Sequence, residues 1–276
     1  MARIYAGDFG EDQAMSRSRT LLGVVHLGPS PSARSHVSMS AVLDQACADA
    51  EAFAAADFDG LVVENFGDAP FRRGTADDPV TPDVVAAVAV AADRVQRASG
   101  LSVGINCLRN DGVAGFGVAA ATGARWVRVN VLNGAYVTDQ GVISGEAARI
   151  AAYRRQLNTD ALLLADFMVK HAVPLAPLDV STGAQDLAER SGADAIVLSG
   201  SRTGRPVDVA LMDEIRHAVG DFPIWIGSGL TPENAAELWR RCDGAIVGTA
   251  CKVAGRSRAP VDVERARRLR SACADG

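Results

Sequence analysis

Two carboxylates in this 276-residue sequence stand where an apolar run turns polar. Glu64 closes the run LVVE and Asp166 closes the run LLLAD, and a carboxylate in such surroundings is partly desolvated unless a cation or a donor meets it. Partial burial adapts a carboxyl group to general acid or base catalysis. We therefore predict that Asp166 is the principal acid or base and that Glu64 is a second catalytic carboxylate.

Two basic side chains are predicted to assist these carboxylates. Lys170 lies four residues after Asp166 and is expected to stabilise charge, with a purely structural ion pair between the two as the alternative. Arg128 is the other candidate cation partner of Asp166. His26 ends the run GVVH, so its imidazole could act as a general acid, donate to a phosphate or pack in the core. Lys170 and His26 complete the predicted catalytic set.

Further polar residues at or just beyond the ends of apolar runs are predicted to bind substrate. One of them, Asp111, could instead cap a helix, because aspartate is a preferred residue at helix N-termini. The predicted substrate-binding residues are Asn65, Asn106, Arg109, Asn110, Asp111, Arg128, Asn130, His171 and Thr203.

Two glycine-rich loops are predicted to hold an anionic group, most simply a phosphate. Glycine lets backbone N–H groups approach an anion closely, and a helix that begins beside the loop adds donors. The loops after the seventh and eighth strands hold phosphate in many barrel enzymes. The alternative is that these glycines only form tight turns. The predicted phosphate-binding residues are Gly227, Ser228, Gly229, Gly248 and Thr249.

The elements that would position these side chains are eight short apolar runs, which we predict to be β-strands. Their continuous Val, Ile and Leu content is typical of parallel strands that are covered by helices. Helical patterns lie between them, with apolar spacings of three and four over residues 39–56 and with Thr-Pro helix starts at 81–82 and 231–232. The runs are residues 21–26, 61–65, 102–107, 126–130, 162–167, 195–199, 223–227 and 244–249.

Strand, loop and helix repeat along the chain without a Pro- or Ser-rich linker, which favours one closed barrel over an open doubly wound sheet. We predict the α/β class and a (β/α)₈ TIM barrel of the phosphate-binding type over residues 21–276, preceded by an N-terminal arm over residues 1–20. The open sheet is the alternative fold. In a barrel the carboxyl ends of all strands meet at one mouth, so the polar residues would converge there.

Composition limits the classes of partner. The net charge of −5 and the pI near 5.4 argue against binding to a nucleic-acid backbone. Five cysteines without a C-x-x-C pair argue against a disulfide framework or a zinc site and favour a reducing, cytoplasmic location. Residues 1–20 contain charges and no apolar run, so we predict neither a signal peptide nor membrane insertion. A homo-oligomer is left open.

No motif for an organic cofactor is present. The sequence lacks G-x-S-x-G, H-E-x-x-H and a G-x-G-x-x-G that opens the first helix, so serine hydrolase, zinc protease and Rossmann functions are not predicted. A divalent metal bound by Glu64, Asp166 and asparagine side chains is an open alternative, because these oxygen ligands form no recognisable motif.

Several phrases of the sequence resemble the BtpA/SgcQ family. They are GVVHL at 23–27, DGLVVENFGDAPF at 59–71, GINCLRND at 104–111, RVNVL at 128–132, DQG at 139–141, VKHA at 169–172 and GSG at 227–229. The resemblance is collinear from about residue 20 to the C-terminus, and it implies a phosphate-binding barrel. It marks the polar positions above as motif residues without an established role for each. The Ser- and Pro-rich loop at 30–38 departs from the family pattern.

Two functions follow as expectations. The resemblance itself points in two directions, because the family is named for a factor needed to accumulate photosystem I in cyanobacteria while another branch accompanies sugar phosphotransferase genes. We predict an enzyme that acts on a phosphorylated sugar or a ribosyl or nucleotide-like compound, with cleavage of a glycosidic bond preferred over isomerase or lyase chemistry. The alternative is a non-catalytic assembly or regulatory factor of the photosystem I biogenesis type, because fold does not fix function.

Overall fold

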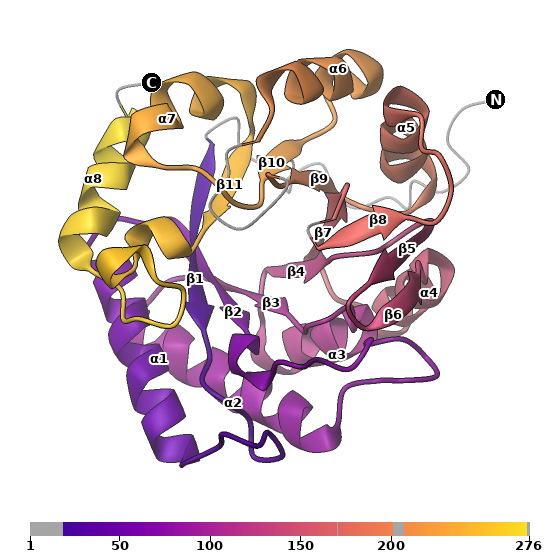
Figure 1. Ribbon diagram of the computed structural model, residues 1–276. Helices are drawn as coiled ribbons and strands as arrows, with labels where there is room; N and C mark the ends of the chain where they lie inside the picture. Colours follow the sequence, from indigo (N-terminus) through magenta and orange to yellow (C-terminus); the bar gives the residue numbers. More distant parts are fainter. Residues whose placement is uncertain (1–18, 170, 201–206, 275–276) are drawn as a thin grey trace.

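Eight parallel strands close into a barrel, and helices surround it (Figure 1). The computed structural model describes residues 19–169, 171–200 and 207–274. The strand order around the barrel is β1-β11-β10-β9-β7-β4-β3-β2, which confirms the predicted fold class. The barrel strands are β1 (Thr20–His26), β2 (Gly60–Glu64), β3 (Val103–Asn106), β4 (Trp126–Val129), β7 (Leu162–Phe167), β9 (Ala195–Leu198), β10 (Ile224–Ile226) and β11 (Gly244–Val247).

Each barrel strand lies where the sequence predicts one, with ends that differ by no more than two residues. The helices alternate with the strands, and short 3₁₀ turns follow β2, α7 and β11. The helices are α1 (Met39–Ala54), α2 (Pro82–Ser99), α3 (Gly112–Thr122), α4 (Ala147–Leu157), α5 (Val180–Arg190), α6 (Val209–Val219), α7 (Pro232–Leu238) and α8 (Val263–Ala274). The 3₁₀ turns are η2 (Phe66–Asp68), η3 (Trp239–Arg241), η4 (Thr249–Cys251) and η5 (Val253–Gly255).

Local signals in the sequence explain where the helices begin. Proline occupies the first helical position of α2 and of α7, where its missing N–H leaves no helical hydrogen bond unmade. Thr231 and Asn234 form a reciprocal capping box at the start of α7. Helix α1 follows Ser38, whose hydroxyl accepts from the N–H of Ala41, and ends at Ala54, two residues before the predicted limit.

A small antiparallel sheet that the sequence analysis did not predict stands beside the barrel mouth. Its strands are β5 (Ala135–Thr138), β6 (Gly141–Ser144) and β8 (Ala172–Pro174), in the order β6-β5-β8. Tyr136 and Ile143 point to a buried side that packs on the barrel. The opposite face exposes Val137, Val142 and Val173, which lie side by side across the three strands.

In the described part of the chain, two apolar cores build the barrel, apart from the small cluster under the antiparallel sheet. A large core lies between the strands and the surrounding helices, and a smaller one fills the inside of the barrel. The inner core includes Leu22, Trp126 and Trp225, so the barrel is packed and not a pore. Beyond the inner core, at the carboxyl ends of the strands, polar residues line a pocket.

A buried ion pair joins the first helix to the last barrel strand. Lys252, just after β11, pairs with Asp49 of α1, and both side chains are almost fully buried. Asp49 also accepts from the side chain of Gln45 and from the N–H of Val261 at 2.8 Å. These bonds fasten the segment after β11 against α1 where the barrel closes.

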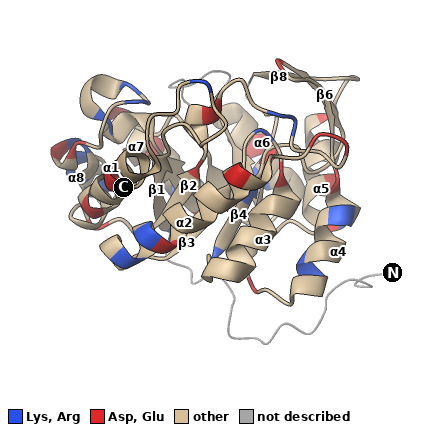
Figure 2. Cartoon of the chain, turned by 90° about the horizontal axis from the view of Figure 1, so that it is seen from below, with Lys and Arg blue, Asp and Glu red and all other residues tan. Residues whose placement is uncertain are grey.

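Most of the predicted N-terminal arm, residues 1–20, lies outside the described residues, so the division into an arm and one barrel domain stays a prediction. Strand β1 already begins at Thr20. Within the described ranges, no helix is both long and apolar enough to cross a membrane. Basic and acidic segments are interspersed over the face seen in Figure 2.

Candidate active site

The polar residues at the barrel mouth continue the inward-facing rows of the strands. Side chains alternate between the two faces of a strand, so every second residue points inward. Leu22 and Leu164, for example, point into the inner core. Counting every second residue from them toward the carboxyl end of each strand leads to a polar residue or a glycine at the mouth. The positions reached are His26, Glu64, Asn106, Arg128, Asp166, Ser199, Gly227 and Gly248.

His26, Glu64 and Asn106 form a chain across three neighbouring strands, as the strand register requires. The amide nitrogen of Asn106 donates to Glu64 Oε2 at 2.7 Å. His26 Nδ1 lies 3.1 Å from the carbonyl of Ser257, which can only accept, so Nδ1 carries a proton. His26 Nε2 then faces Glu64 Oε1 at 3.8 Å, which is too long for a hydrogen bond. This half of the mouth thus places an imidazole beside a carboxylate.

The pKa of His26 predicts how stability depends on pH. Burial lowers this pKa from 6.5, although Glu64 opposes the shift. As pH falls below about 6.5 the unfolded chain therefore binds a proton at His26 before the folded chain does, and stability is lost. We expect His26→Gln to lose less stability than the wild type between about pH 7.5 and pH 5.5 in urea unfolding. An equal loss of unfolding free energy in the variant and the wild type would contradict the lowered pKa of His26.

Arg128 and Asp166 form a buried bidentate ion pair in the other half of the mouth. Arg128 Nε donates to Asp166 Oδ1 at 2.9 Å and Nη2 donates to Oδ2 at 3.0 Å. Asn130 donates to the same Oδ2 at 2.6 Å. Burial would lower the pKa of Arg128, but the neighbouring Asp166 holds it above its ordinary value. Both oxygens of Asp166 are thus engaged, whereas no residue that the structure describes donates a hydrogen bond to Glu64 Oε1.

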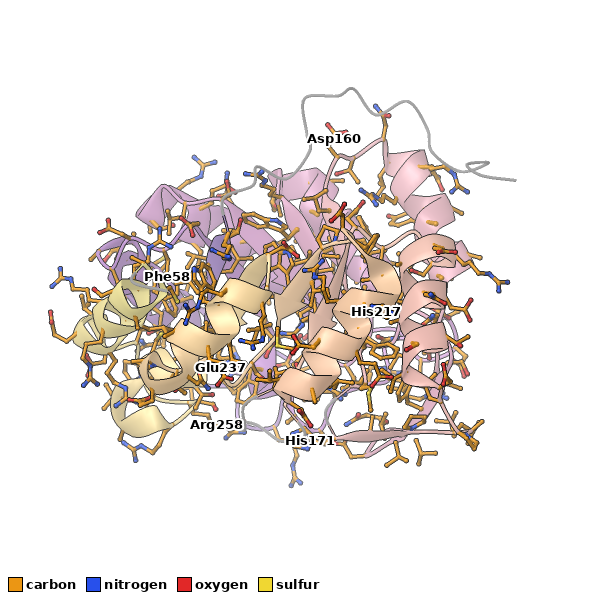
Figure 3. All side chains as sticks on the ribbon, turned by 90° about the horizontal axis from the view of Figure 1, so that it is seen from above. Phe58, Asp160, His171, His217, Glu237 and Arg258 are labelled. Atoms are coloured by element: carbon orange, nitrogen blue, oxygen red, sulfur yellow. The ribbon has the colours of Figure 1, made fainter. Side chains whose placement is uncertain are left out.

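These side chains line a pocket of about 330 Å³, near the lower end of the usual range for small-molecule sites. Of the residues predicted from the sequence, Lys170 and Thr203 lie outside the described residues. Figure 3 places His171 at the same end of the barrel as Arg258, next to the pocket residue Ser257, and Asp160 at the opposite end. The predicted residues that line the pocket are His26, Glu64, Asn106, Arg109, Arg128, Asn130, Asp166, His171, Gly227, Ser228, Gly229, Gly248 and Thr249.

The pocket belongs to a chain with a recognisable family. The sequence profile of the BtpA family matches residues 17–275. The chain belongs to the BtpA family. It is 40% identical to the photosystem I biogenesis protein BtpA of Synechocystis, over 96% of this chain and 91% of that protein. An uncharacterised protein of Pyrococcus abyssi is also 40% identical, over 91% of this chain and 95% of its own length.

Solved structures similar to this BtpA-family chain include enzymes. N-(5'-phosphoribosyl)anthranilate isomerase from Pyrococcus furiosus matches 94% of this chain and 100% of its own, with a TM-score of 0.56 and 12% identity. Orotidine 5'-phosphate decarboxylase from Pyrococcus horikoshii matches 92% of this chain and 99% of its own, with a TM-score of 0.57 and 12% identity. At this identity the likeness shows the fold alone.

Three of the polar residues predicted to bind substrate fasten loops of the BtpA-family barrel and do not line the pocket. Asn65 accepts from the N–H of Leu108 at 2.7 Å, and Asn110 exchanges two hydrogen bonds with the backbone of Val131. Asp111 caps α3 by accepting from the N–H of Ala114 at 2.9 Å, which was its alternative role. Asn65 directly follows the inward-facing Glu64 at the end of β2, whereas Asn110 and Asp111 lie in the loop between β3 and α3.

Several pocket-lining residues of this family member were not predicted from the sequence, among them Phe66, Phe71 and Ser257. Phe66 and Phe71 contribute apolar surface, and the ring centroid of Phe66 lies 4.5 Å from that of His26. Both lie in the phrase ENFGDAPF, but the sequence analysis selected only polar residues and glycines as site residues, so it did not include them. Ser257 accepts from His26 through its carbonyl, and its hydroxyl lies 2.8 Å from that of Thr249. No local sequence pattern predicts this contact, because Ser257 lies 231 residues after His26.

Gly227 leaves room for the Arg128 guanidinium. A Cβ there would lie 2.5 Å from Val197 Cγ1 and 2.8 Å from Arg128 Nη2. We expect Gly227→Ala to cost about 1–3 kcal/mol of unfolding free energy through overpacking, measured by thermal or urea unfolding. Gly117→Ala on α3 is the matched control, because its Cβ would meet only ordinary contacts from 3.5 Å. Equal stability of the two variants would contradict the crowding at Gly227.

A ready-made metal centre is absent from the described part of this BtpA-family chain, which contains no group of three or more His, Cys, Asp or Glu side chains able to hold a metal ion. The two carboxylates proposed as metal ligands are engaged by other side chains instead. Glu64 accepts from Asn106, and Asp166 pairs with Arg128.

Proposed function

We propose that this protein is an enzyme that acts on a phosphorylated sugar or a ribosyl or nucleotide-like compound. The observation that carries the proposal is the ring of inward positions, which combines two carboxylates, a histidine and an arginine beside two glycine-rich loops in one pocket. Barrel enzymes assemble their active sites at this end from several strands. The two fold neighbours named above are enzymes, and both names contain a phosphorylated compound.

We assign the two carboxylates different roles. Glu64 is the group that exchanges a proton, because its Oε1 faces His26 and accepts no hydrogen bond from any residue that the structure describes. Asp166 is a fixed negative charge, because three hydrogen bonds from Arg128 and Asn130 occupy its oxygens. A proton donor beside a fixed carboxylate suits cleavage of a glycosidic bond, whose transition state gains positive charge on the sugar. The sequence analysis gave Asp166 the first role, and this assignment reverses the order.

The glycine-rich loops are the proposed phosphate end of the pocket. Gly227, Ser228 and Gly229 follow β10, and Gly248 and Thr249 follow β11. The hydroxyl of Ser228 is buried and makes no hydrogen bond to any described residue. An unpaired buried hydroxyl is costly, and a phosphate oxygen would satisfy it.

Thermal unfolding with a panel of anions tests the proposal. The probes are ribose 5-phosphate, glucose 6-phosphate, a nucleoside monophosphate and inorganic phosphate. A ligand at one hundred times its Kd adds about 2.7 kcal/mol, which raises Tm by roughly 5–10 °C in a chain of this size. We expect such a rise with at least one sugar-containing probe. No rise with any probe would remove the proposal.

A second candidate is a non-catalytic assembly factor. It is favoured by the name of the Synechocystis relative and by the apolar face of the β6-β5-β8 sheet, which exposes Val137, Val142 and Val173. This candidate expects activity in cells to survive Glu64→Gln and to fail when Val137 and Val173 become serine. The enzyme proposal expects the reverse.

The cytoplasmic location and a homo-oligomeric state also belong to the proposal. Cell fractionation and light scattering would test them directly.

A further inference from the structure

Two asparagines of the pocket have amide oxygens without a partner. Asn106 and Asn130 are 1% and 5% exposed, and both line the pocket. Neither Oδ1 makes a hydrogen bond to any residue that the structure describes. Buried side-chain acceptors nearly always accept a hydrogen bond. Two unpaired amide oxygens in one pocket therefore point to hydrogen bonds that a ligand donates.

The carboxylates fix the orientation of both amides. Asn106 Nδ2 donates to Glu64 Oε2 at 2.7 Å, and Asn130 Nδ2 donates to Asp166 Oδ2 at 2.6 Å. A flipped amide would bring its oxygen against a carboxylate oxygen, and both atoms only accept. The nitrogen of each amide therefore belongs to the carboxylate, and the oxygen is left for a ligand.

An amide oxygen recognises donors and repels anions. A phosphate or carboxylate oxygen of the ligand would not satisfy it, whereas a hydroxyl would. A hydroxyl can also accept from a guanidinium, and Arg109 and Arg128 line the same pocket. The chemistry of this end of the pocket thus differs from that of the glycine-rich loops.

We propose that Asn106 and Asn130 select a sugar with at least two free hydroxyl groups, which they bind through their amide oxygens while the phosphate lies at the glycine-rich loops. This inference rests on the proposed function and narrows its substrate class. A sugar that lacks one of these hydroxyls leaves a buried acceptor unpaired, and a polar site rejects such an analogue strongly.

Calorimetric titration of the wild-type protein with matched probes tests the inference. The pairs are ribose 5-phosphate with 2-deoxyribose 5-phosphate, and glucose 6-phosphate with 2-deoxyglucose 6-phosphate, with inorganic phosphate as the reference. We expect at least one parent sugar to bind about 5- to 150-fold more tightly than its deoxy partner, the range for one unpaired buried acceptor. Because this series uses only the wild type, it holds whether or not a variant folds.

Asparagine variants supply the second measurement. In Asn106→Ala and Asn130→Ala the preference for the parent sugar should fall toward one, while the affinity for inorganic phosphate stays unchanged. Gln156→Ala, which removes an exposed amide on α4, is the matched control and should keep the full preference. Equal binding of parent and deoxy sugars with retained phosphate binding would overturn this inference and leave the proposed function standing. Failure of every probe to bind would overturn both.

Discussion

Asp166→Asn is expected to lower the unfolding free energy by about 3–5 kcal/mol, or Tm by roughly 6–20 °C, because it leaves a buried guanidinium without its counter-charge. The side chains of Arg128 and Asp166 are only 8% and 3% exposed, and they share two hydrogen bonds. Asparagine keeps the size of the side chain but removes its charge. Chemical and thermal unfolding of the purified variant measure the loss.

Asp93→Asn is the control for this experiment. Asp93 pairs with Arg97 on α2, but both side chains are largely exposed, and surface pairs contribute about 0–1 kcal/mol. A small change in both variants would mean that Asp166 is not needed to compensate Arg128. Asp166 would then return to its predicted role as the acid or base.

Glu64→Gln is expected to keep the fold and the ligand affinity while it lowers turnover by roughly 10²- to 10⁴-fold, the usual contribution of a positioned acid or base. The glutamine can still accept a hydrogen bond from Asn106. Removing the charge of Glu64 leaves no buried cation without a counter-charge, because burial lowers the pKa of His26 and keeps its imidazole mostly neutral. Turnover is measured on the sugar phosphate that raises Tm most.

The control is Glu237→Gln, an exposed change on α7 that Figure 3 places on the outer surface of the barrel. It should leave turnover unchanged. If Glu64→Gln turns over as fast as the wild type, Glu64 is not the proton-exchanging group. If it binds no ligand at all, Glu64 acts in binding and the assignment fails in a different way.

The barrel itself could be predicted because its signal is local. Buried parallel strands need continuous branched apolar residues, and glycine, proline and capping residues mark the turns between them. The β6-β5-β8 sheet was missed although its hairpin has a signal, since Tyr136 and Val137 alternate in burial and a two-residue turn at Asp139 and Gln140 follows. β8 pairs with β5 from more than thirty residues away, and nothing local specifies that partner.

The sequence predicted which segments contribute to the candidate site, but not which side chains of those segments face the pocket. The sequence places Glu64 beside Asn65, but only the pleat decides that the first faces the mouth and the second faces a loop. Counting in steps of two from the apolar inner rows would have separated them. The sequence offered two cations as the partner of Asp166, Lys170 four residues later and Arg128 38 residues earlier, and the structure pairs Asp166 with Arg128.

The ion pair between Asp49 and Lys252 makes the two ends of the chain depend on each other. Its members are 203 residues apart and belong to opposite sides of the seam between β1 and β11. A fragment cut before β11 would keep a buried carboxylate and lose its cation, so neither piece of a split gene should fold well alone, and the two should assemble when expressed together.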